Sequence, residues 1–147
     1  MGKYDALKLE RQLCFPLYAC SKEIIRLYKP FLDKLDLTYT QYITMLILWE
    51  KETITSHELG ECLYLDSGTL TPLLKKLESK EYLTRQRDKN DERNLIISLT
   101  DKGLKLKDEA VSVPTCMGQC IPLEKDDALR LYNTLCELLK KLLKRAF

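Results

Sequence analysis

The sequence predicts a mainly α (α+β) fold built from one domain of 147 residues. Hydrophobic residues make up 45% of the chain, which contains only five Gly and five Pro, a composition typical of globular, helix-rich proteins. Apolar residues recur at three- and four-residue steps along most of the sequence. The period shortens to two only between residues 83 and 99, which predicts a small amount of β structure.

Charge and hydropathy exclude several classes of protein. The 24 Lys and Arg residues nearly balance the 22 Asp and Glu residues, so the chain is neither a basic tail protein nor an acidic disordered one. No uncharged run reaches the ~18 residues that a membrane-spanning helix needs. Charged residues also stand near the N-terminus, where a signal peptide has its apolar stretch. We therefore expect a cytoplasmic protein without membrane contact.

Residues 5–33 have the spacing of one long amphipathic helix. Its apolar positions are Leu7, Leu13, Cys14, Leu17, Tyr18, Ile24, Ile25, Tyr28 and Leu32. Pro16 lacks the N–H of a helical hydrogen bond, so we expect a kink near Phe15. Pro30 is expected to mark the end of this helix.

Residues 40–51 predict a short helix that is apolar on nearly every side. Its apolar residues are Ile43, Met45, Leu46, Ile47, Leu48 and Trp49. A helix of this kind belongs at the centre of a core.

Two further short helices follow, joined by three or four residues. Thr55 or Ser56 can cap the first, with Glu58 in its first turn. Asp66 or Ser67 can cap the second. The second helix has a leucine stripe at Leu70, Leu73, Leu74 and Leu77. Two short helices connected this tightly predict a helix-turn-helix.

Residues 83–87 and 94–99 predict two strands, joined by a charged, turn-forming segment at residues 88–93. Such a hairpin would be exposed, and a helix-turn-helix followed by it makes a winged helix. Thr100 is expected to cap a helix that runs to about Val113. Pro114, Gly118 and Pro122 then interrupt the chain.

The segment from Leu123 to the C-terminus predicts a last amphipathic helix. Its C-terminal cations suit the helix dipole and are Lys140, Lys141, Lys144 and Arg145. Both terminal helices have apolar faces too long for one small domain to cover, which favours a twofold homodimer. We expect residues 1–35 and 114–147 to dimerise and residues 36–113 to form the winged helix-turn-helix. The alternative is that these helices cover their own domain.

The six cysteines stand at positions 14, 20, 62, 116, 120 and 136, and His57 is the one histidine. No Cys-x-x-Cys pair is present, so neither a zinc site nor any other cofactor site is predicted, although Cys116 and Cys120 could lie one helical turn apart. A disulfide framework of the secreted type does not suit a reducing cytoplasm. The thiols are then either small core residues or redox-responsive groups.

The chain resembles the MarR family of bacterial transcriptional regulators. The resemblance rests on the order of elements and on Asp91-x-Arg93 followed by Leu99-Thr100-x-x-Gly103. Three segments resemble the organic-hydroperoxide-sensing, OhrR-type subgroup: Gln12-Leu13-Cys14-Phe15-x-Leu17-Tyr18, Tyr28-Lys29-Pro30 and Tyr64-Leu65-Asp66-Ser67-Gly68-Thr69-Leu70-Thr71-Pro72. Pro16 departs from the pattern, where an aliphatic residue is expected.

The resemblance implies that the helix from Ser67 enters the major groove of double-stranded DNA at a palindromic, AT-rich operator. Ser67, Thr69 and Thr71 would face bases or phosphates, and Lys75 and Lys76 would meet phosphates. The alternative is an ordinary solvated helix face.

The charged residues of the hairpin complete the expected DNA interface. Arg93 resembles the family's minor-groove arginine, and Asp91 would orient it. Arg85 and Arg87 would contact the DNA backbone or, alternatively, pair with acidic neighbours.

The resemblance also implies that Cys14 is the residue oxidised by organic hydroperoxide. Tyr18 and Tyr28 would donate hydrogen bonds to its thiolate, reaching it from the partner subunit. Cys116, or Cys120 one turn later, would resolve the oxidised sulfur as an intersubunit disulfide. Cys20, Cys62 and Cys136 are expected to be core residues.

The leading hypothesis is therefore a homodimeric repressor, not an enzyme, that releases DNA when Cys14 is oxidised. One alternative keeps the DNA-binding module but replaces thiol chemistry by a small phenolic or aromatic effector at the dimer junction. A second alternative is a thiol peroxidase, although the sequence lacks the βαβ order of thioredoxin-like enzymes.

Overall fold

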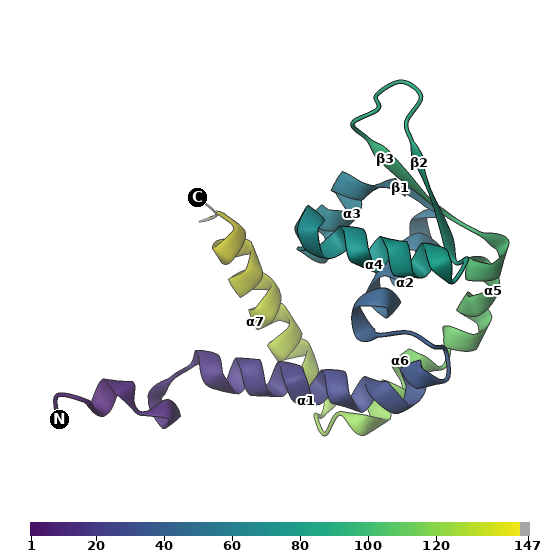
Figure 1. Ribbon diagram of the computed structural model, residues 1–147. Helices are drawn as coiled ribbons and strands as arrows, with labels where there is room; N and C mark the ends of the chain where they lie inside the picture. Colours follow the sequence, from purple (N-terminus) through teal and green to yellow (C-terminus); the bar gives the residue numbers. More distant parts are fainter. Residues whose placement is uncertain (145–147) are drawn as a thin grey trace. The chain divides into compact units, whose positions relative to one another are not determined.

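The structure, a computed structural model, describes residues 1–144 and contains two units, residues 1–117 and the segment from Gly118 onward (Figure 1). Arg145, one of the cations expected at the last helix, lies outside the described residues. In chain order the elements are η1 (Asp5–Leu7), η2 (Leu9–Arg11), α1 (Cys14–Asp33), α2 (Tyr39–Lys51), β1 (Thr53–Thr55), α3 (Ser56–Leu63), α4 (Ser67–Ser79), β2 (Leu83–Arg87), β3 (Leu95–Leu99), α5 (Asp101–Ala110), α6 (Val113–Cys120) and α7 (Lys125–Lys144). The predicted fold class, a mainly helical winged helix-turn-helix, is confirmed.

The first helix starts later than its spacing predicts, at Cys14, and residues 5–11 form two 3₁₀ turns instead. Pro16 explains the difference, because a proline inside a longer helix would remove one hydrogen bond and press its ring against the carbonyl of Gln12. As the third residue of α1, it stands where backbone N–H groups have no helical partner. The kink expected near Phe15 is therefore replaced by a helix start.

The second proline does not end α1, which continues to Asp33. Pro30 leaves the carbonyl of Arg26 without its helical partner, but both residues are exposed and water can take its place. Leu32 is the one buried residue of α1, so this helix joins the core of its unit through its C-terminal end.

The helix α2 forms the centre of the first unit, as predicted. Thr38 caps it in a box with Gln41: Gln41 N–H donates to the Thr38 hydroxyl at 3.3 Å, and Thr38 N–H donates to Gln41 Oε1 at 3.1 Å. Met45 and Leu48 are fully buried. The helix is not buried on every side, however, because the apolar Leu46 remains exposed.

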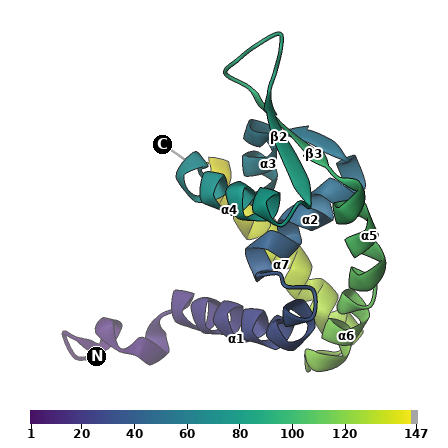
Figure 2. The ribbon, with the colours of Figure 1, turned by 45° about the vertical axis from the view of Figure 1, so that its right-hand side comes forward.

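The helix-turn-helix follows the predicted caps. Thr55 forms a capping box with Glu58 at the start of α3, and Asp66 caps α4. The wing strands β2 and β3 pair antiparallel with Leu83 opposite Leu99. In both views their connecting loop projects away from α3 and α4 (Figures 1 and 2).

A third strand, β1, escapes prediction because it has only three residues. It pairs antiparallel with β3, Ile54 lying opposite Ile97, and both side chains are buried. The sheet order is therefore β1-β3-β2. Burial of Ile54 and Ile97 anchors the wing to the helical core.

The helix expected to run from Thr100 to about Val113 is α5, which Thr100 caps and which ends at Ala110, and a further helix, α6, begins at Val113. Pro114 is the second residue of α6, in the first turn, where proline is tolerated. Residues 113–120, interpreted from sequence as interrupted chain, are thus helical and place Cys116 and Cys120 on one helix.

The last amphipathic helix is confirmed as α7, and none of its residues is buried. No helix within residues 1–144 combines the length and the hydropathy needed to span a membrane.

Candidate functional site

The start of α4 presents a polar face to solvent. Asp66 accepts a hydrogen bond from Thr69 N–H at 2.8 Å, which lowers the pKa of the Asp66 carboxyl. The leucine stripe packs into the core, and Leu74 and Leu77 are almost completely buried. The five predicted DNA-contacting residues of α4 are all exposed on the other side: Ser67, Thr69, Thr71, Lys75 and Lys76.

These polar residues have the arrangement that a helix needs in order to read a groove. Ser67, Thr71 and Lys75 follow one another at four-residue steps, so they form one row along the helix. Hydroxyls lie at the N-terminal end and the ammonium lies further along. This order suits base-edge contacts at the helix start and phosphate contacts beyond it.

The wing holds Arg93 in an extended, accessible position. Asp91 accepts from Arg93 Nε at 3.1 Å, from Nη2 at 3.3 Å and from the Arg93 backbone N–H at 3.1 Å. The guanidinium lowers the pKa of the Asp91 carboxyl. The Arg93 side chain nevertheless remains 90% exposed, so Asp91 orients it without covering it.

The two arginines of β2 differ in what they contact. Arg87 donates to the Glu92 carbonyl at 3.0 Å and remains exposed within the wing. Arg85 binds Glu78 of α4 through Nη2 at 3.0 Å and Nε at 3.2 Å, and its side chain is only 20% exposed. The same bond lowers the pKa of Glu78. The geometry of Arg85 favours the alternative of pairing with an acidic neighbour.

Cys14 is exposed and is the first residue of α1. Sequence reasoning placed it inside a longer helix, and Pro16 two residues later is the signal that could have identified a helix start. The position puts Cys14 beside the first-turn N–H groups that lack helical partners. The two residues after Cys14, Phe15 and Pro16, line a cavity of about 600 Å³. The other residues that line it are Lys8, Leu9 and Glu10.

Within a single chain, Tyr18 and Tyr28 cannot both lie close to Cys14. Tyr18 stands one turn after Cys14 and is exposed. Tyr28 stands fourteen residues after Cys14 in the same helix, about 21 Å along its axis at 1.5 Å per residue. Tyr28 can therefore reach a Cys14 sulfur only in another copy of the chain.

Tyr28 packs against α2 instead. Its ring centroid lies 4.9 Å from that of Tyr39 and 5.8 Å from that of Tyr42. Burial, and secondarily Tyr39, raises the pKa of Tyr28 above the ordinary 10.0. The phenol is thus protonated at neutral pH and keeps its hydroxyl hydrogen for donation.

All six cysteines are free thiols in the structure. Cys116 is half-buried and Cys120 is exposed. The expectation that Cys20 and Cys62 are core residues is wrong for the single chain, since both are exposed on helix faces that turn away from the core. Cys136 is half-buried on α7, and its proximity raises the pKa of Tyr132. Within residues 1–144, no three His, Cys, Asp or Glu side chains are grouped as ligands for a metal ion.

Two helices carry large exposed apolar side chains. On α1 they are Phe15, Leu17, Tyr18, Ile24, Ile25 and Leu27. On α7 they are Leu129, Leu131, Tyr132, Leu135, Leu138, Leu142 and Leu143. Apolar surface this extensive on a folded chain marks an interaction site.

Comparison with known proteins gives consistent findings. Residues 26–110 match a family model described as transcriptional regulator SarA/Rot. The chain is 50% identical over 144 residues to the organic hydroperoxide resistance transcriptional regulator of Bacillus subtilis (strain 168). The alignment covers 96% of each chain.

Two solved structures of AbfR of Staphylococcus epidermidis are also similar. Reduced AbfR bound to DNA superimposes with a TM-score of 0.77 at 35% identity, covering 97% of this chain and 99% of that one. The disulfide form of AbfR gives a TM-score of 0.64 at 34% identity, covering 97% of each chain.

Proposed function

Because the chain belongs to the SarA/Rot family of transcriptional regulators, which are MarR-like winged-helix proteins, we propose that it is a homodimeric repressor whose DNA binding is switched off by oxidation of Cys14. The oxidant is an organic hydroperoxide. The observation that carries the proposal is Cys14 itself: it is an exposed thiol at the start of α1, in a chain half identical to a regulator named for organic hydroperoxide resistance.

The reading surface consists of α4 and the wing. Ser67, Thr69 and Thr71 face base edges in the major groove, and Lys75 and Lys76 contact phosphates. Arg93, held by Asp91, enters an adjacent narrow minor groove of AT-rich sequence. Arg87 lies on the same wing and contacts the DNA backbone. We expect such an operator to be palindromic, because a twofold dimer presents the same reading surface twice. We also propose a cytoplasmic location, because that is where a repressor would meet its operator.

The chemistry at Cys14 begins with its thiolate, the nucleophilic form of the side chain. The sulfur attacks the hydroperoxide, an S–O bond forms and the O–O bond breaks. One proton is taken up, and an alcohol leaves. Sulfur is oxidised by two electrons to sulfenic acid, and the peroxide is reduced. Phe15 and Pro16, which follow Cys14 in the chain, line a cavity together with Leu9, and these apolar side chains suit the hydrocarbon part of an organic hydroperoxide.

The second step joins two subunits. The thiol of Cys116 or Cys120 of the other copy attacks the sulfenic sulfur, an S–S bond forms and water leaves. The bond brings two sulfurs to about 2 Å, so α1 must move. We propose that this movement changes the separation of the two α4 helices, which DNA requires to be about one helical turn. The protein is modified once per event and does not turn over as an enzyme.

A dimer follows from the same geometry. Tyr18 and Tyr28 complete a Cys14 site in the partner, since Tyr28 lies about 21 Å from Cys14 in its own helix. The exposed apolar faces of α1 and α7 supply the surface that the two copies bury. Residues 1–35 and 114–147 thus dimerise, and residues 36–113 read DNA.

The test compares Cys14→Ser with Cys62→Ser, which removes another exposed thiol. The DNA is a fluorescein-labelled duplex selected by the reduced protein from a randomised pool. Cumene hydroperoxide should release the DNA from wild type and from Cys62→Ser, but not from Cys14→Ser. Release from Cys14→Ser would contradict the proposal and favour control by a small phenolic or aromatic effector.

Non-reducing electrophoresis identifies the resolving residue. Peroxide should convert the wild type to a crosslinked dimer that is absent from Cys14→Ser. Loss of the crosslink in Cys116→Ser assigns Cys116, and its loss in Cys120→Ser alone assigns Cys120. A crosslink that persists in the double variant contradicts resolution by α6.

A further inference from the structure

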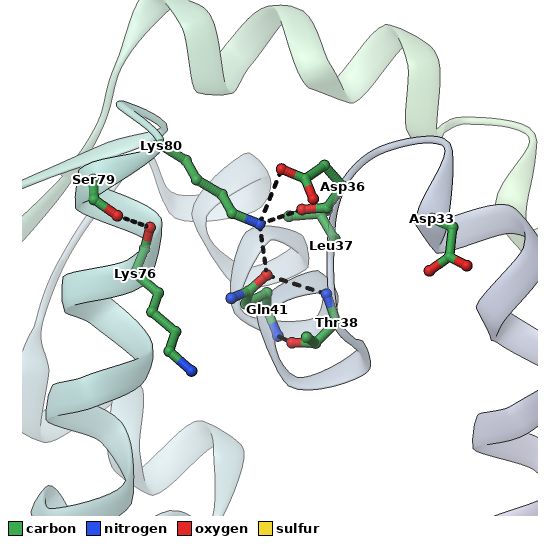
Figure 3. A pocket seen from close by; sticks show the side chains of 8 residues that line it. All are labelled: Asp33, Asp36, Leu37, Thr38, Gln41, Lys76, Ser79 and Lys80. Atoms are coloured by element: carbon green, nitrogen blue, oxygen red, sulfur yellow. Dashed lines mark hydrogen bonds and ion pairs between the residues drawn. The ribbon is translucent and has the colours of Figure 1, made fainter.

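We propose that Lys80 is a positioning residue that couples the thiol-bearing helix α1 to the DNA-reading helix α4. This inference rests on the proposed function and identifies the contact through which movement of α1 reaches the reading helix. Figure 3 shows Lys80 extending from the end of α4 toward Asp36 and Gln41, whereas Lys76 and Asp33 point elsewhere.

Lys80 is fixed to α4 through its backbone. It is the C-cap residue, and its N–H donates to the Lys76 carbonyl at 3.2 Å. Its side chain is 27% exposed and extends from α4 to the segment that joins α1 to α2, residues 34–38, which we call the corner. A cavity of about 450 Å³ lies at this junction, so polar contacts of Lys80 connect elements that are not closely packed there.

The ammonium of Lys80 contacts three oxygen atoms, two of Asp36 in the corner and one of Gln41 in α2. It donates to the backbone carbonyl of Asp36, forms an ion pair with Asp36 Oδ2 at 3.4 Å and donates to Gln41 Oε1 at 3.3 Å. Gln41 is only 3% exposed, and the same oxygen accepts the Thr38 N–H that caps α2. Lys80 therefore binds a residue of the connection after α1 and a residue in the first turn of α2.

The corner is hydrogen-bonded to the last turn of α1. Leu35 and Leu37 N–H groups both donate to the Leu32 carbonyl in the last turn of α1, at 3.0 Å each. Both leucines are buried. Asp36 between them has a φ of 53°, a left-handed conformation that Asp tolerates and that aims its carbonyl out of the helical path. A displacement of α1 thus shifts the oxygens to which Lys80 is bound.

The role of α1 as a rigid connection is consistent with its length. Its twenty residues span about 30 Å, with Cys14 at one end and the Lys80-bound corner following the other. The helix transmits a pull at its start to its far end, and Lys80 passes that displacement to the C-terminal end of α4.

The test measures DNA affinity before and after cumene hydroperoxide, using the selected duplex. For a coupled wild type, the dissociation constant should rise at least about tenfold on oxidation, within the usual range for linked sites. In Lys80→Met, which keeps the length but removes the charge, α4 is freed from the corner. The ratio of the two constants should fall to about threefold or less. Lys80→Arg should restore it.

Lys102→Met is the matched control, because Lys102 also forms an exposed ion pair, with Glu81 at 3.5 Å, but does not contact the corner. It should keep the wild-type ratio. Asp36→Asn leaves the carbonyl in place and suits the left-handed φ, so it folds and should lower the ratio by about twofold. Mass spectrometry must show equal oxidation of Cys14 in each variant.

The outcomes distinguish failure of the proposed function from failure of the coupling through Lys80. If oxidation leaves the wild-type dissociation constant unchanged, the proposed function is contradicted. If the wild type responds and Lys80→Met and Asp36→Asn weaken binding equally in both states, Lys80 is only a stabilising contact and the coupling is contradicted. Should Lys80→Met fail to fold, Asp36→Asn with an unchanged ratio contradicts it alone.

Discussion

Among the five glycines, Gly103 is the one at which the fold leaves the least room for a side chain. A Cβ built there would lie 2.2 Å from the Tyr82 carbonyl oxygen and 2.8 Å from Leu99 Cδ1. The Gly103 carbonyl also accepts the Trp49 Nε1–H bond at 2.8 Å, which ties α5 to α2. The close approach of backbone explains why a side chain is absent from this position of the Leu-Thr-x-x-Gly segment.

Gly103→Ala should therefore destabilise the protein by about 1–3 kcal/mol, the usual cost of overpacking. Gly118→Ala is the control, since nothing lies within 4 Å of a Cβ at that helical position, and it should be neutral or stabilising by up to about 1 kcal/mol. Urea unfolding at neutral pH measures both. Equal free energies of unfolding for wild type and Gly103→Ala would contradict the packing described.

The arginines of the wing should separate binding from stability. Arg93→Ala removes a 90% exposed side chain, so it should weaken DNA binding, reduce the preference for AT-rich flanks and leave the melting temperature unchanged. Arg85→Met removes the partner of Glu78, so it should lower the melting temperature and change the salt dependence of DNA binding little. A lower melting temperature for Arg93→Ala, together with weaker DNA binding but unchanged stability for Arg85→Met, would contradict the geometry of both residues.

At the scale of elements, strong local signals were predictable from sequence and weak ones were not. The caps and leucine stripe of α3 and α4, and the alternation of β2 and β3, specify those elements locally. Strand β1 forms because β3 is there to pair with it, a long-range condition that three residues cannot signal. The helix boundaries near Pro16 and Pro114 were predicted wrongly, because proline is as common in the first turn of a helix as it is unfavourable in the interior.

The pairing of α4 with β2 should be pH-dependent. Arg85 lowers the pKa of Glu78 below the ordinary 4.5 in the folded chain. A carboxylate with a lowered pKa stabilises the fold above its ordinary pKa, and this contribution is lost as the pH falls through the folded value. Glu78→Gln should thus melt a few degrees below wild type at pH 7, and the gap should narrow by pH 3.

Glu81→Gln is the control for that measurement, because its carboxylate is 79% exposed and lies 3.5 Å from Lys102. Exposed pairs contribute little, so its melting temperature should follow that of wild type at both pH values. A gap between Glu78→Gln and wild type that widens toward pH 3 would contradict the ion pair between α4 and β2.

At the scale of the whole molecule, the exposure and local pairing of candidate site residues could be predicted from sequence, but contacts between residues distant in the chain could not. The exposed polar face of α4 and the Asp91–Arg93 pair lie where expected. The relation of Cys14 to Tyr28 could not be read from one chain, because a helix keeps them about 21 Å apart. The contacts of Lys80 were equally hidden, since they join residues 36 and 41 to residue 80.

Dimerisation through the terminal helices is tested by placing a charge on α1. Ile25 and Leu46 are each 42% exposed in the single chain, so Arg at either position should leave the subunit folded. Ile25→Arg should bury an unpaired charge in the dimer, which costs about 3–5 kcal/mol, and shift the protein toward monomer. Leu46→Arg should remain dimeric. Light scattering after size exclusion gives both masses, and a monomeric wild type would contradict the assembly.

The most direct measurement follows DNA release and the state of one sulfur in the same samples. Cumene hydroperoxide is titrated into the protein–DNA complex while anisotropy reports bound DNA and peptide mass spectrometry reports the fraction of Cys14 still present as thiol. The two curves should fall together. DNA that leaves while Cys14 remains a thiol, or stays bound after Cys14 is fully oxidised, would contradict the account.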